Sequence, residues 1–496
     1  MSETEKDWCS RTNHRGHTPG APRDPIINHY MQFPSREMQK YNNRLPFCAW
    51  MDKAWTVMLC KQGLVKKETA AKLFPVLAEA EKEHGWGGED WIKAKLDGDE
   101  YTASAVNFGR TLQEPMWRMQ MRAALLDVFD ELFDALESVL DKSEQNADVM
   151  MAGQSHFSHA QPTTYGAYLL AVHDGMSRAL AQLELAYRFL NMNSGGCGAC
   201  SGTGWPVDRE LVTELLGFDE TIECTYDCEG SQDEIPQILF ALSSLALTVE
   251  RSAMDHGIWS LEEINNVELT PGWLGISSFM PQKAHSGGHF ENVRSGANDV
   301  IGQMMTAVIT FKNESIQDNL PVYRSPGYVT AGCCHAIKML GMWANILKNT
   351  VVNRERMLEI ARQGYSGAPD LAIKMIRGQD YAGRQAHRIC CNFVRLARER
   401  GIKPYETTGE LLDEAARITG DPEPHLSTED VQDAMNLETF FEKHNNLGDP
   451  CPSETLRMLK LRSADLEAAR QRQAERRRRI EDARAKLQAE MDAIVG

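Results

Sequence analysis

Residues 116–152 read MWRMQMRAALLDVFDELFDALESVLDKSEQNADVMMA and contain neither glycine nor proline. Such an uninterrupted stretch is longer than an ordinary globular helix. Its apolar residues recur at helical spacing: Met121, Leu125, Val128, Phe129, Leu132, Leu136 and Val139. A helix with an apolar stripe must bury that stripe against another element. The stretch therefore predicts one long helix of a bundle.

Two more parts of the chain carry the same pattern. Their stripes are Ile235, Ile238, Leu239, Leu242, Leu245, Val249 and Ala253, and then Val293, Ala297, Val300, Ile301, Met304, Met305, Val308 and Ile309. Strand signals are nearly absent. We therefore predict an all-α fold with a long central helix bundle, flanked by smaller helical N- and C-terminal domains.

Changes in composition along the chain divide it into four parts. Residues 1–110 form an N-terminal arm, extended over residues 1–45, followed by a small helical domain. Residues 111–350 hold the bundle, and residues 351–462, broken by glycines and prolines, form a small C-terminal helical domain.

Residues 463–496 are expected to form a charged helical extension. Four consecutive arginines, Arg476 to Arg479, are interleaved with Glu475, Glu481 and Asp482. A basic run can bind anionic lipid or nucleic acid, but acidic neighbours favour a solvated or subunit-facing helix.

The overall composition limits the classes of function. The 496 residues carry a net charge of −17, which argues against nucleic acid as a partner. No run of 18 apolar residues and no signal peptide is present, so we expect no membrane span and a cytoplasmic protein.

The 12 cysteines do not resemble a disulfide framework in a chain of this length. Cys197 and Cys200 form a CxxC pair near Cys224 and Cys228, a set that could bind a metal as four thiolates. We favour a packing role for these cysteines and predict that no metal and no cofactor is needed. No glycine-rich phosphate loop or dinucleotide fingerprint is present either.

Residues 275–283 read Gly-Ile-Ser-Ser-Phe-Met-Pro-Gln-Lys and are expected to form a loop, because Gly275 and Pro281 are turn residues. A loop of this kind can bring the Ser277 oxygen close to the Lys283 ammonium, which would stabilise an alkoxide that acts as a base. Incidental serines in a surface loop are the alternative.

This loop resembles the Ser-Ser-x-Met-Pro-x-Lys loop of the aspartase/fumarase superfamily, and Gln282 is typical of its argininosuccinate lyases. Two further blocks stand in the order of that family. Residues 153–164 are similar to its Gly-Tyr-Thr-His-x-Gln-x-Ala-Gln-Pro-x-Thr, and residues 202–210 to its Gly-x-x-Phe-Pro-Ile-Asp-Arg-Glu. The resemblance covers roughly residues 45–465.

The resemblance implies roles for individual residues. Ser277 is the expected base with Ser278 beside it, and Lys283 would hold the carboxylate of the substrate. On the leaving-group side stand Ser155 and His156, and Glu291 would orient His156. The expected substrate contacts are Arg110, Thr111, Gln113, Gln161, Thr163 and His285. In this superfamily the three blocks of one site come from three subunits, which implies a homotetramer.

The reaction implied is elimination of fumarate from an N-substituted aspartate by a carbon–nitrogen lyase that abstracts the α-proton with a serine. The substrate would be argininosuccinate-like or an aminopolycarboxylate. Alternatives are a lyase or cycloisomerase on another succinyl-type substrate, and a non-catalytic structural protein with the same fold.

Several positions depart from the argininosuccinate lyase pattern. Leu112 and Gln232 stand where that subfamily has arginine, and His285 replaces an asparagine. Because these are substrate-contacting places, we expect argininosuccinate to be a poor substrate.

Overall fold

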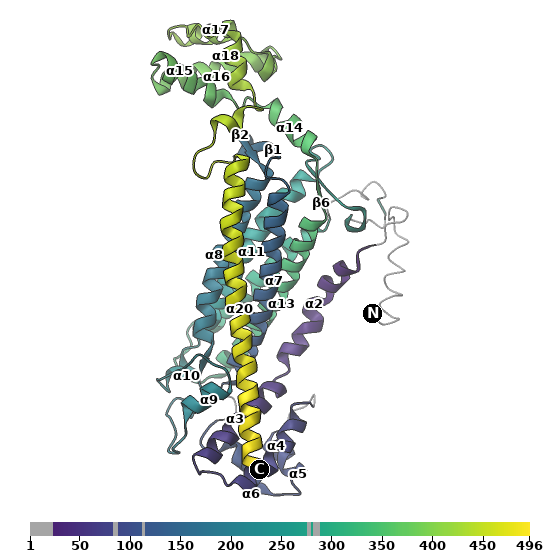
Figure 1. Ribbon diagram of the computed structural model, residues 1–496, viewed down its shortest axis with the longest axis vertical. Helices are drawn as coiled ribbons and strands as arrows, with labels where there is room; N and C mark the ends of the chain where they lie inside the picture. The colour runs from purple at the N-terminus through teal and green to yellow at the C-terminus, as the bar shows by residue number, and fades with distance from the viewer. Residues whose placement is uncertain (1–22, 83–87, 112–114, 275–278, 281–287) are drawn as a thin grey trace.

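The computed structural model describes residues 23–82, 88–111, 115–274, 279–280 and 288–496, apart from the side chains of residues 39 and 321–323. The molecule is elongated, with long helices in the middle and smaller groups of helices at both ends (Figure 1). The predicted all-α fold is confirmed, with three short two-stranded sheets among the described residues.

Five long helices form the central bundle. They are α7 (Met116–Glu144), α8 (Tyr165–Leu190), α11 (Glu234–Trp259), α12 (Phe290–Phe311) and α13 (Leu320–Lys348). The apolar stripe predicted on α7 is buried throughout, from Met121 to Val139, and forms the main core with the stripe of α11. Burial of these stripes explains why the helices lie side by side.

The helix predicted for residues 116–152 is wrong at its end, because α7 stops at Glu144. Beyond it, the Asn146 amide donates to the carbonyl of Lys142 (2.8 Å), and the carbonyl of Asn146 accepts from the Gly166 N–H (3.1 Å). These bonds satisfy groups at the helix end without glycine or proline. The chain then enters an antiparallel hairpin of β1 (Met150–Ser155) and β2 (Ser158–Thr164).

Two smaller sheets join distant parts of the chain. The strand β3 (Met192–Asn193) runs parallel to β4 (Glu220–Thr221). The strand β5 (Val267–Leu269) pairs antiparallel with β6 (Thr350–Val352), and the short helix η2 (Pro271–Trp273) follows β5. The second pairing places the segment before the serine loop at the end of α13.

The extended arm predicted for residues 1–45 is wrong over its described part. Residues 25–42 form a helix, α2 (Pro25–Asn42), which lies against α13 and α7. Ile27 is fully buried, and the Tyr30 hydroxyl donates to Glu131 of α7 (2.7 Å). Tertiary contacts of these few side chains stabilise a helix that the local sequence does not favour.

Short helices gather at the lower end of the bundle in Figure 1 around a second core. They are α3 (Leu45–Lys61), α4 (Lys67–Ala80), α5 (Glu89–Lys95), α6 (Glu100–Ser104), η1 (Ala105–Asn107) and α9 (Arg209–Leu215). The short helix α10 (Asp227–Gly230) contributes Cys228 to a separate small cluster with Cys197 and Ile222.

A third group lies at the opposite end and has its own core. It follows α14 (Arg354–Gln363) and consists of α15 (Ala368–Gln379), α16 (Gly383–Glu399), η4 (Pro404–Glu406), α17 (Gly409–Thr419), α18 (Thr428–Met435) and α19 (Phe440–Lys443).

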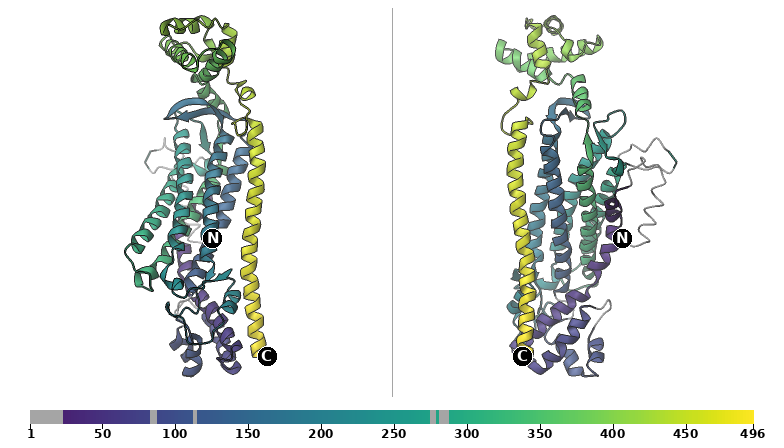
Figure 2. Two further views of the ribbon diagram at one scale, coloured as in Figure 1. Left: turned by 90° about the vertical axis from the view of Figure 1, so that its left-hand side faces the viewer. Right: turned by 45° about the vertical axis from the view of Figure 1, so that its right-hand side comes forward.

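The last helix, α20 (Pro452–Val495), returns along the whole bundle and ends beside the N-terminal helices (Figure 2). The boundary expected at residue 463 lies inside this helix. Its arginines pair with the chain's own bundle: Arg462 binds Asp174, Arg472 binds Glu184 and Arg477 binds Asp127. One side of the expected charged helix therefore packs on α7 and α8, while many of its residues are exposed. Within the described ranges, no helix combines the length and apolarity that crossing a membrane requires.

Candidate active site

The β1–β2 hairpin presents two of the predicted catalytic residues at its tip. Ser155 pairs with Ser158, and the two residues between them, His156 and Phe157, have φ values of 53° and 57°. Two consecutive positive φ values are typical of the tight hairpin turns whose twist matches the strands. Ser155 and His156 are exposed, and Phe157 is 92% exposed. The hydroxyl of Ser155 and the imidazole of His156 are therefore accessible at the tip to a group from outside the hairpin.

Gln161 and Thr163 lie further along β2 and are half-buried. The hairpin backbone is close-packed at this point. A Cβ on Gly153 would come within 2.3 Å of the Gln161 carbonyl oxygen, so only glycine fits opposite Gln161. Thr164 ends the strand and caps α8, its hydroxyl accepting from the Ala167 N–H (3.1 Å). The backbone that carries the predicted substrate contacts Gln161 and Thr163 is therefore closely packed and held in place.

The hairpin rests on the start of the C-terminal part of the chain. Ala152 packs with Ala361 of α14 and with Leu437 in a small apolar cluster. A Cβ on Gly364 would lie 2.8 Å from the ring of His159, so the hairpin and the end of α14 are in direct contact.

Thr111 and Arg110 lie at the other end of the bundle, after η1. Thr111 is exposed, as a substrate contact should be. Arg110 is not: its side chain is 1% exposed, its Nη2 pairs with Asp52, and its Nε donates to the Val106 carbonyl (3.0 Å). These contacts favour a structural role for Arg110 over the predicted substrate contact. Gln113, like Leu112, lies outside the described residues.

Glu291 is exposed in the first turn of α12. The loop before it holds Ser277, Ser278, Lys283 and His285, which all lie outside the described residues. Both flanks of this loop are held together, because the rings of Trp273 and His289 meet edge to face with centroids 5.7 Å apart.

The flanks of the loop are also anchored to the N-terminal part of the chain. Trp273 Nε1 donates to Asp24 (3.0 Å). Burial lowers the pKa of His289 to about 4, and Arg23 adds to this effect, so His289 is neutral at physiological pH. A neutral imidazole can stay buried without a counter-charge.

The predicted site residues that the structure describes do not all come together in one chain. The hairpin tip and the start of α12, which follows β5, lie towards the upper end of the bundle in Figure 1, whereas Thr111 follows η1 at the lower end. The full length of α7 separates Thr111 from the hairpin. A site that uses both ends must draw them from different copies of the chain.

Asp52, which lies 58 residues before Arg110 and neutralises it, is not among the residues that the sequence motifs predict for the site. A lone acid in the predicted small helical domain has no local signal that would distinguish it from a surface residue. Only the fold brings Asp52 and Arg110 together.

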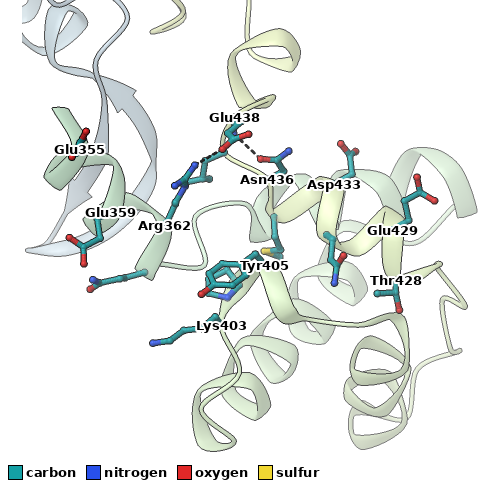
Figure 3. A pocket seen from close by; sticks show the side chains of 15 residues that line it. Glu355, Glu359, Arg362, Lys403, Tyr405, Thr428, Glu429, Asp433, Asn436 and Glu438 are labelled. Atoms are coloured by element: carbon teal, nitrogen blue, oxygen red, sulfur yellow. Dashed lines mark hydrogen bonds and ion pairs between the residues drawn. The ribbon is translucent and has the colours of Figure 1, made fainter.

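A large cleft of about 1120 Å³ lies elsewhere, between α14 and the C-terminal helices (Figure 3). Its wall is rich in acidic residues, including Glu355, Glu359 and Glu429, and the nearby Arg362 pairs with Glu438. Among the described residues, no predicted site residue lines this cleft. It separates α14, which supports the hairpin, from the small C-terminal domain.

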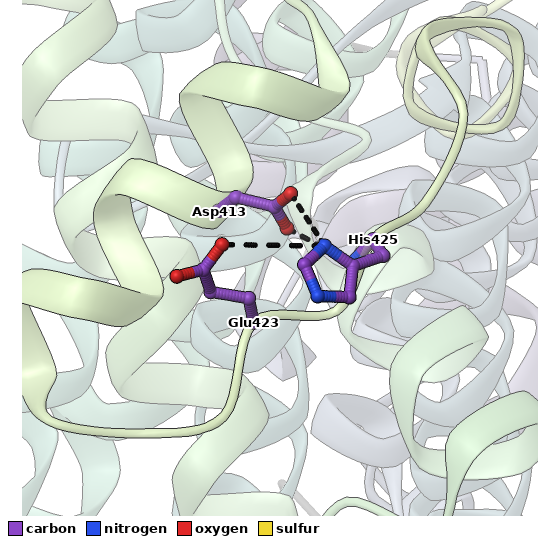
Figure 4. A group of neighbouring side chains, drawn as sticks. All are labelled: Asp413, Glu423 and His425. Carbon is purple, nitrogen blue, oxygen red and sulfur yellow. Dashed lines mark hydrogen bonds and ion pairs between the residues drawn. The ribbon is translucent and has the colours of Figure 1, made fainter.

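A compact group of potential metal ligands also lies away from the predicted site. Asp413, Glu423 and His425 are the one such group that the described residues contain (Figure 4). Asp413 accepts from the backbone N–H of His425 (2.8 Å) and contacts its Nδ1 (3.0 Å), while Glu423 pairs with Arg417 (2.9 Å). These bonds stabilise the loop after α17, so the three side chains have a structural role without a metal ion.

Comparison with known proteins places these features in context. Residues 90–302, which include Thr111, the hairpin and Glu291, match the family described as Lyase. The argininosuccinate lyase of Methanothrix thermoacetophila is 28% identical over 462 residues, covering 90% of this chain and 92% of its own. The chain is similar to argininosuccinate lyases over most of its length.

Solved structures agree on the fold of this argininosuccinate lyase-like chain. EDDS lyase in complex with formate superposes with a TM-score of 0.90 and 24% identity, over 98% of both chains. The class II fumarase of Schistosoma mansoni superposes with a TM-score of 0.66 and 15% identity, over 83% of this chain and 95% of its own.

Proposed function

We propose that the protein cleaves the carbon–nitrogen bond of an N-substituted aspartate and releases fumarate, with Ser277 as the base. The broader assignment, a carbon–nitrogen lyase that releases fumarate, is supported by the similarity of the chain to argininosuccinate lyases. The observation that carries the proposal is the hairpin tip, where Ser155 and His156 stand exposed on a rigid turn inside the region similar to lyases.

The chemistry requires three groups in different places. The proton that is removed lies α to a carboxylate and is weakly acidic, so the negative charge must be stabilised as it forms. The Ser277 alkoxide would take this proton, and Lys283 would hold the carboxylate that receives the charge. The carbon–nitrogen bond then breaks, its electron pair leaves with nitrogen, and Ser155 or His156 supplies the proton that completes the amine.

We propose that the site is assembled from several copies of the chain, as a homotetramer. Exposed apolar residues on α11 support this: Phe240, Leu247 and Met254 recur every seven residues on one face, and Phe240 is 61% exposed. The neighbouring α12 adds Met305, Val308 and Ile309. Exposed apolar surface of this extent is typical of an interface. A stable, active monomer in light scattering would contradict the assembly.

The substrate is expected to be an N-substituted aspartate other than argininosuccinate. Gln232, which replaces an arginine, is neutral and donates its amide N–H to the carbonyl of Glu229 in the preceding helix α10 (3.3 Å), so it does not restore the lost charge. Leu112 and His285, the other departures, lie outside the described residues. A change at one hydrogen-bonding contact alters discrimination by about 10²-fold or more, which is visible in kcat/KM.

Ultraviolet absorbance of fumarate tests the proposal directly. The purified protein is mixed with a panel of N-substituted aspartates that includes argininosuccinate, and the rise in absorbance gives kcat/KM for each. We expect fumarate from at least one compound and a low value for argininosuccinate. If argininosuccinate is the best substrate, the substrate proposal is wrong; if no compound yields fumarate, the elimination itself is wrong.

Substitution of the base tests the mechanism. Ser277→Ala should lower kcat by roughly 10²–10⁴-fold or more, because a general base contributes that much. The control is Ser295→Ala, at an exposed serine on α12 a little beyond the loop, which should leave kcat unchanged. Circular dichroism checks that both variants fold. Activity of Ser277→Ala within about tenfold of the wild type would exclude Ser277 as the base.

A further inference from the structure

Three aromatic rings form an exposed surface next to Thr111. Trp205, from the block similar to lyases at residues 202–210, stacks on Phe108 with ring centroids 5.2 Å apart and planes at 25°. Tyr101 meets Phe108 edge to face at 5.7 Å. Trp205 is 41% exposed and Tyr101 57% exposed. We call Tyr101, Phe108 and Trp205 the aromatic surface.

The position of the Trp205 ring is fixed by the backbone beneath it. Gly109 has φ +77°, and a Cβ there would lie 3.0 Å from both Cβ and Cγ of Trp205. The side chain of Trp205 therefore packs directly on the glycine. Phe108 is held in turn, because the Trp55 indole N–H donates to its carbonyl (2.8 Å). The ring is therefore in place before any ligand arrives, which lowers the entropy cost of binding.

Trp205 is 41% exposed, so a cation can reach part of its indole ring. The two nearest arginines in the sequence turn inwards: Arg110 pairs with Asp52, and Arg209 donates to the carbonyls of Gly195 and Ile222 (both 2.8 Å). In the described part of the chain, no arginine or lysine stacks on Trp205. The face of an indole is the aromatic surface that attracts cations most strongly.

We infer that Trp205 is a specificity-determining residue that holds a positively charged amine substituent of the substrate against its exposed indole face. The inference rests on the proposed function, in which Thr111 contacts a substrate carboxylate. Thr111 follows two residues after Gly109, on which Trp205 lies, so the two side chains are close enough in the chain to contact the same small molecule. The similar motif has phenylalanine at this position, and tryptophan presents a larger face.

Two substrates that differ only in charge test the inference. N-(3-aminopropyl)aspartate and N-butylaspartate have the same length, but the first ends in an ammonium and the second in a methyl. We measure kcat/KM for both with the wild type, Trp205→Leu and Trp205→Phe. The ratio should favour the ammonium compound in the wild type and fall about 2- to 30-fold in Trp205→Leu, the range expected for a cation–π contact. Trp205→Phe should fall less, because a smaller aromatic face remains.

Trp91→Phe is the matched control. Trp91 is half-buried on α5, at the same end of the molecule, and stacks with Lys95 (5.0 Å) instead of a substrate. Its ratio should equal that of the wild type. An unchanged ratio in Trp205→Leu overturns the inference, as does an equal loss for both compounds, which indicates packing alone. Dissociation of the assembly with an unchanged ratio identifies Trp205 as a subunit contact and also overturns it.

Binding supplies a readout that does not need turnover. Propane-1,3-diamine should quench the tryptophan fluorescence of the wild type but not of Trp205→Phe, and the difference isolates one of the 10 tryptophans. Equal quenching in both proteins overturns the inference. If no compound releases fumarate but the quenching difference is present, the proposed function fails and the cation site at Trp205 stands.

Discussion

Asp52 and Arg110 form an ion pair beneath the segment that presents Thr111. Their side chains are 17% and 1% exposed, and the Arg110 guanidinium also lies over the ring of Trp55, 5.7 Å from its centroid. Burial raises the pKa of Asp52, and the charge of Arg110 opposes that rise. The pair therefore fixes the position of a predicted substrate contact from below and leaves Thr111 itself at the surface.

Asp52→Asn should destabilise the protein by about 3–5 kcal/mol, because it leaves the Arg110 charge buried without a partner. Thermal unfolding followed by circular dichroism measures the loss. Asp90→Asn is the control, since Asp90 is exposed on α5 and its change should stay within about 0.5 kcal/mol. Equal melting temperatures for the Asp52→Asn variant and the wild type would show that the pair does not stabilise the fold.

The long helices could be predicted because their apolar stripes are a local signal. Met121 to Val139 recur at the helical period, and each packs into the main core. The helix α2 could not be predicted in this way. Pro25 and Pro34 lie within it, and its burial depends on a few side chains, such as Ile27, that reach α7 and α13. Such contacts are invisible to any short window of sequence.

The site shows the same division between local motifs and distant contacts. The motif around His156 identified an exposed, chemically active segment, but not that a hairpin with two positive φ values presents it. Arg110 was predicted as a substrate contact from its neighbours in the block, whereas its buried pairing depends on Asp52 of another helix. A motif therefore indicates which segment matters better than which side chain of that segment faces the substrate.

Two inactive variants should restore activity when they are mixed. In one chain Thr111 and His156 lie at opposite ends of the bundle, so a site that uses both takes them from different subunits. Thr111→Ala and His156→Ala should each be inactive alone. Random assemblies of the two, formed by co-expression with two affinity tags, should contain intact sites and recover roughly a quarter of wild-type activity.

Mixing of the folded proteins without exchange of subunits is the control for this prediction and should give no recovery. If both variants are inactive alone, a co-expressed mixture that stays inactive would show that Thr111 and His156 of the same chain serve one site. Fumarate release measures both cases. Activity of either variant alone near the wild-type value would remove that residue from the site.

Arg476 should matter more for stability than its neighbour Arg478. The Arg476 guanidinium binds Glu184 (3.0 Å) and lies over the rings of Phe129 and Tyr187, 4.9 Å from each centroid. Arg476→Ala should cost about 1.5–3 kcal/mol, as expected for a charge-assisted bond that is half-buried. Arg478 is exposed and pairs only with Glu475 at 3.6 Å, so Arg478→Ala should cost about 0.5 kcal/mol or less.

Urea unfolding of the two arginine variants measures this difference under one set of conditions. Equal urea midpoints for the two variants would mean that the contacts of Arg476 do not stabilise the packing of α20 on the bundle. A loss that appears only at high protein dilution would assign the effect to subunit assembly instead.

Glu131 should make the stability of the protein fall as pH rises. Burial raises the pKa of Glu131 to about 7, and the hydrogen bond from Tyr30 only partly opposes this rise. The ordinary pKa of a glutamate is 4.5. Between these values the folded chain keeps a proton that the unfolded chain has lost, so unfolding releases a proton. The contribution of this group is therefore complete below pH 4.5 and is lost as pH rises to about 7.

Glu131→Gln tests this dependence, because glutamine stays neutral at every pH and can still accept from Tyr30. The difference in the free energy of unfolding between variant and wild type should be small at pH 5 and should favour the variant at pH 8. Each unit of pKa shift corresponds to about 1.4 kcal/mol. Histidines such as His256, whose pKa burial lowers to about 4, have the opposite dependence but cancel in this difference. A difference that stays constant from pH 5 to pH 8 would show that Glu131 is ionised in the folded protein throughout, and that Tyr30 bonds a carboxylate.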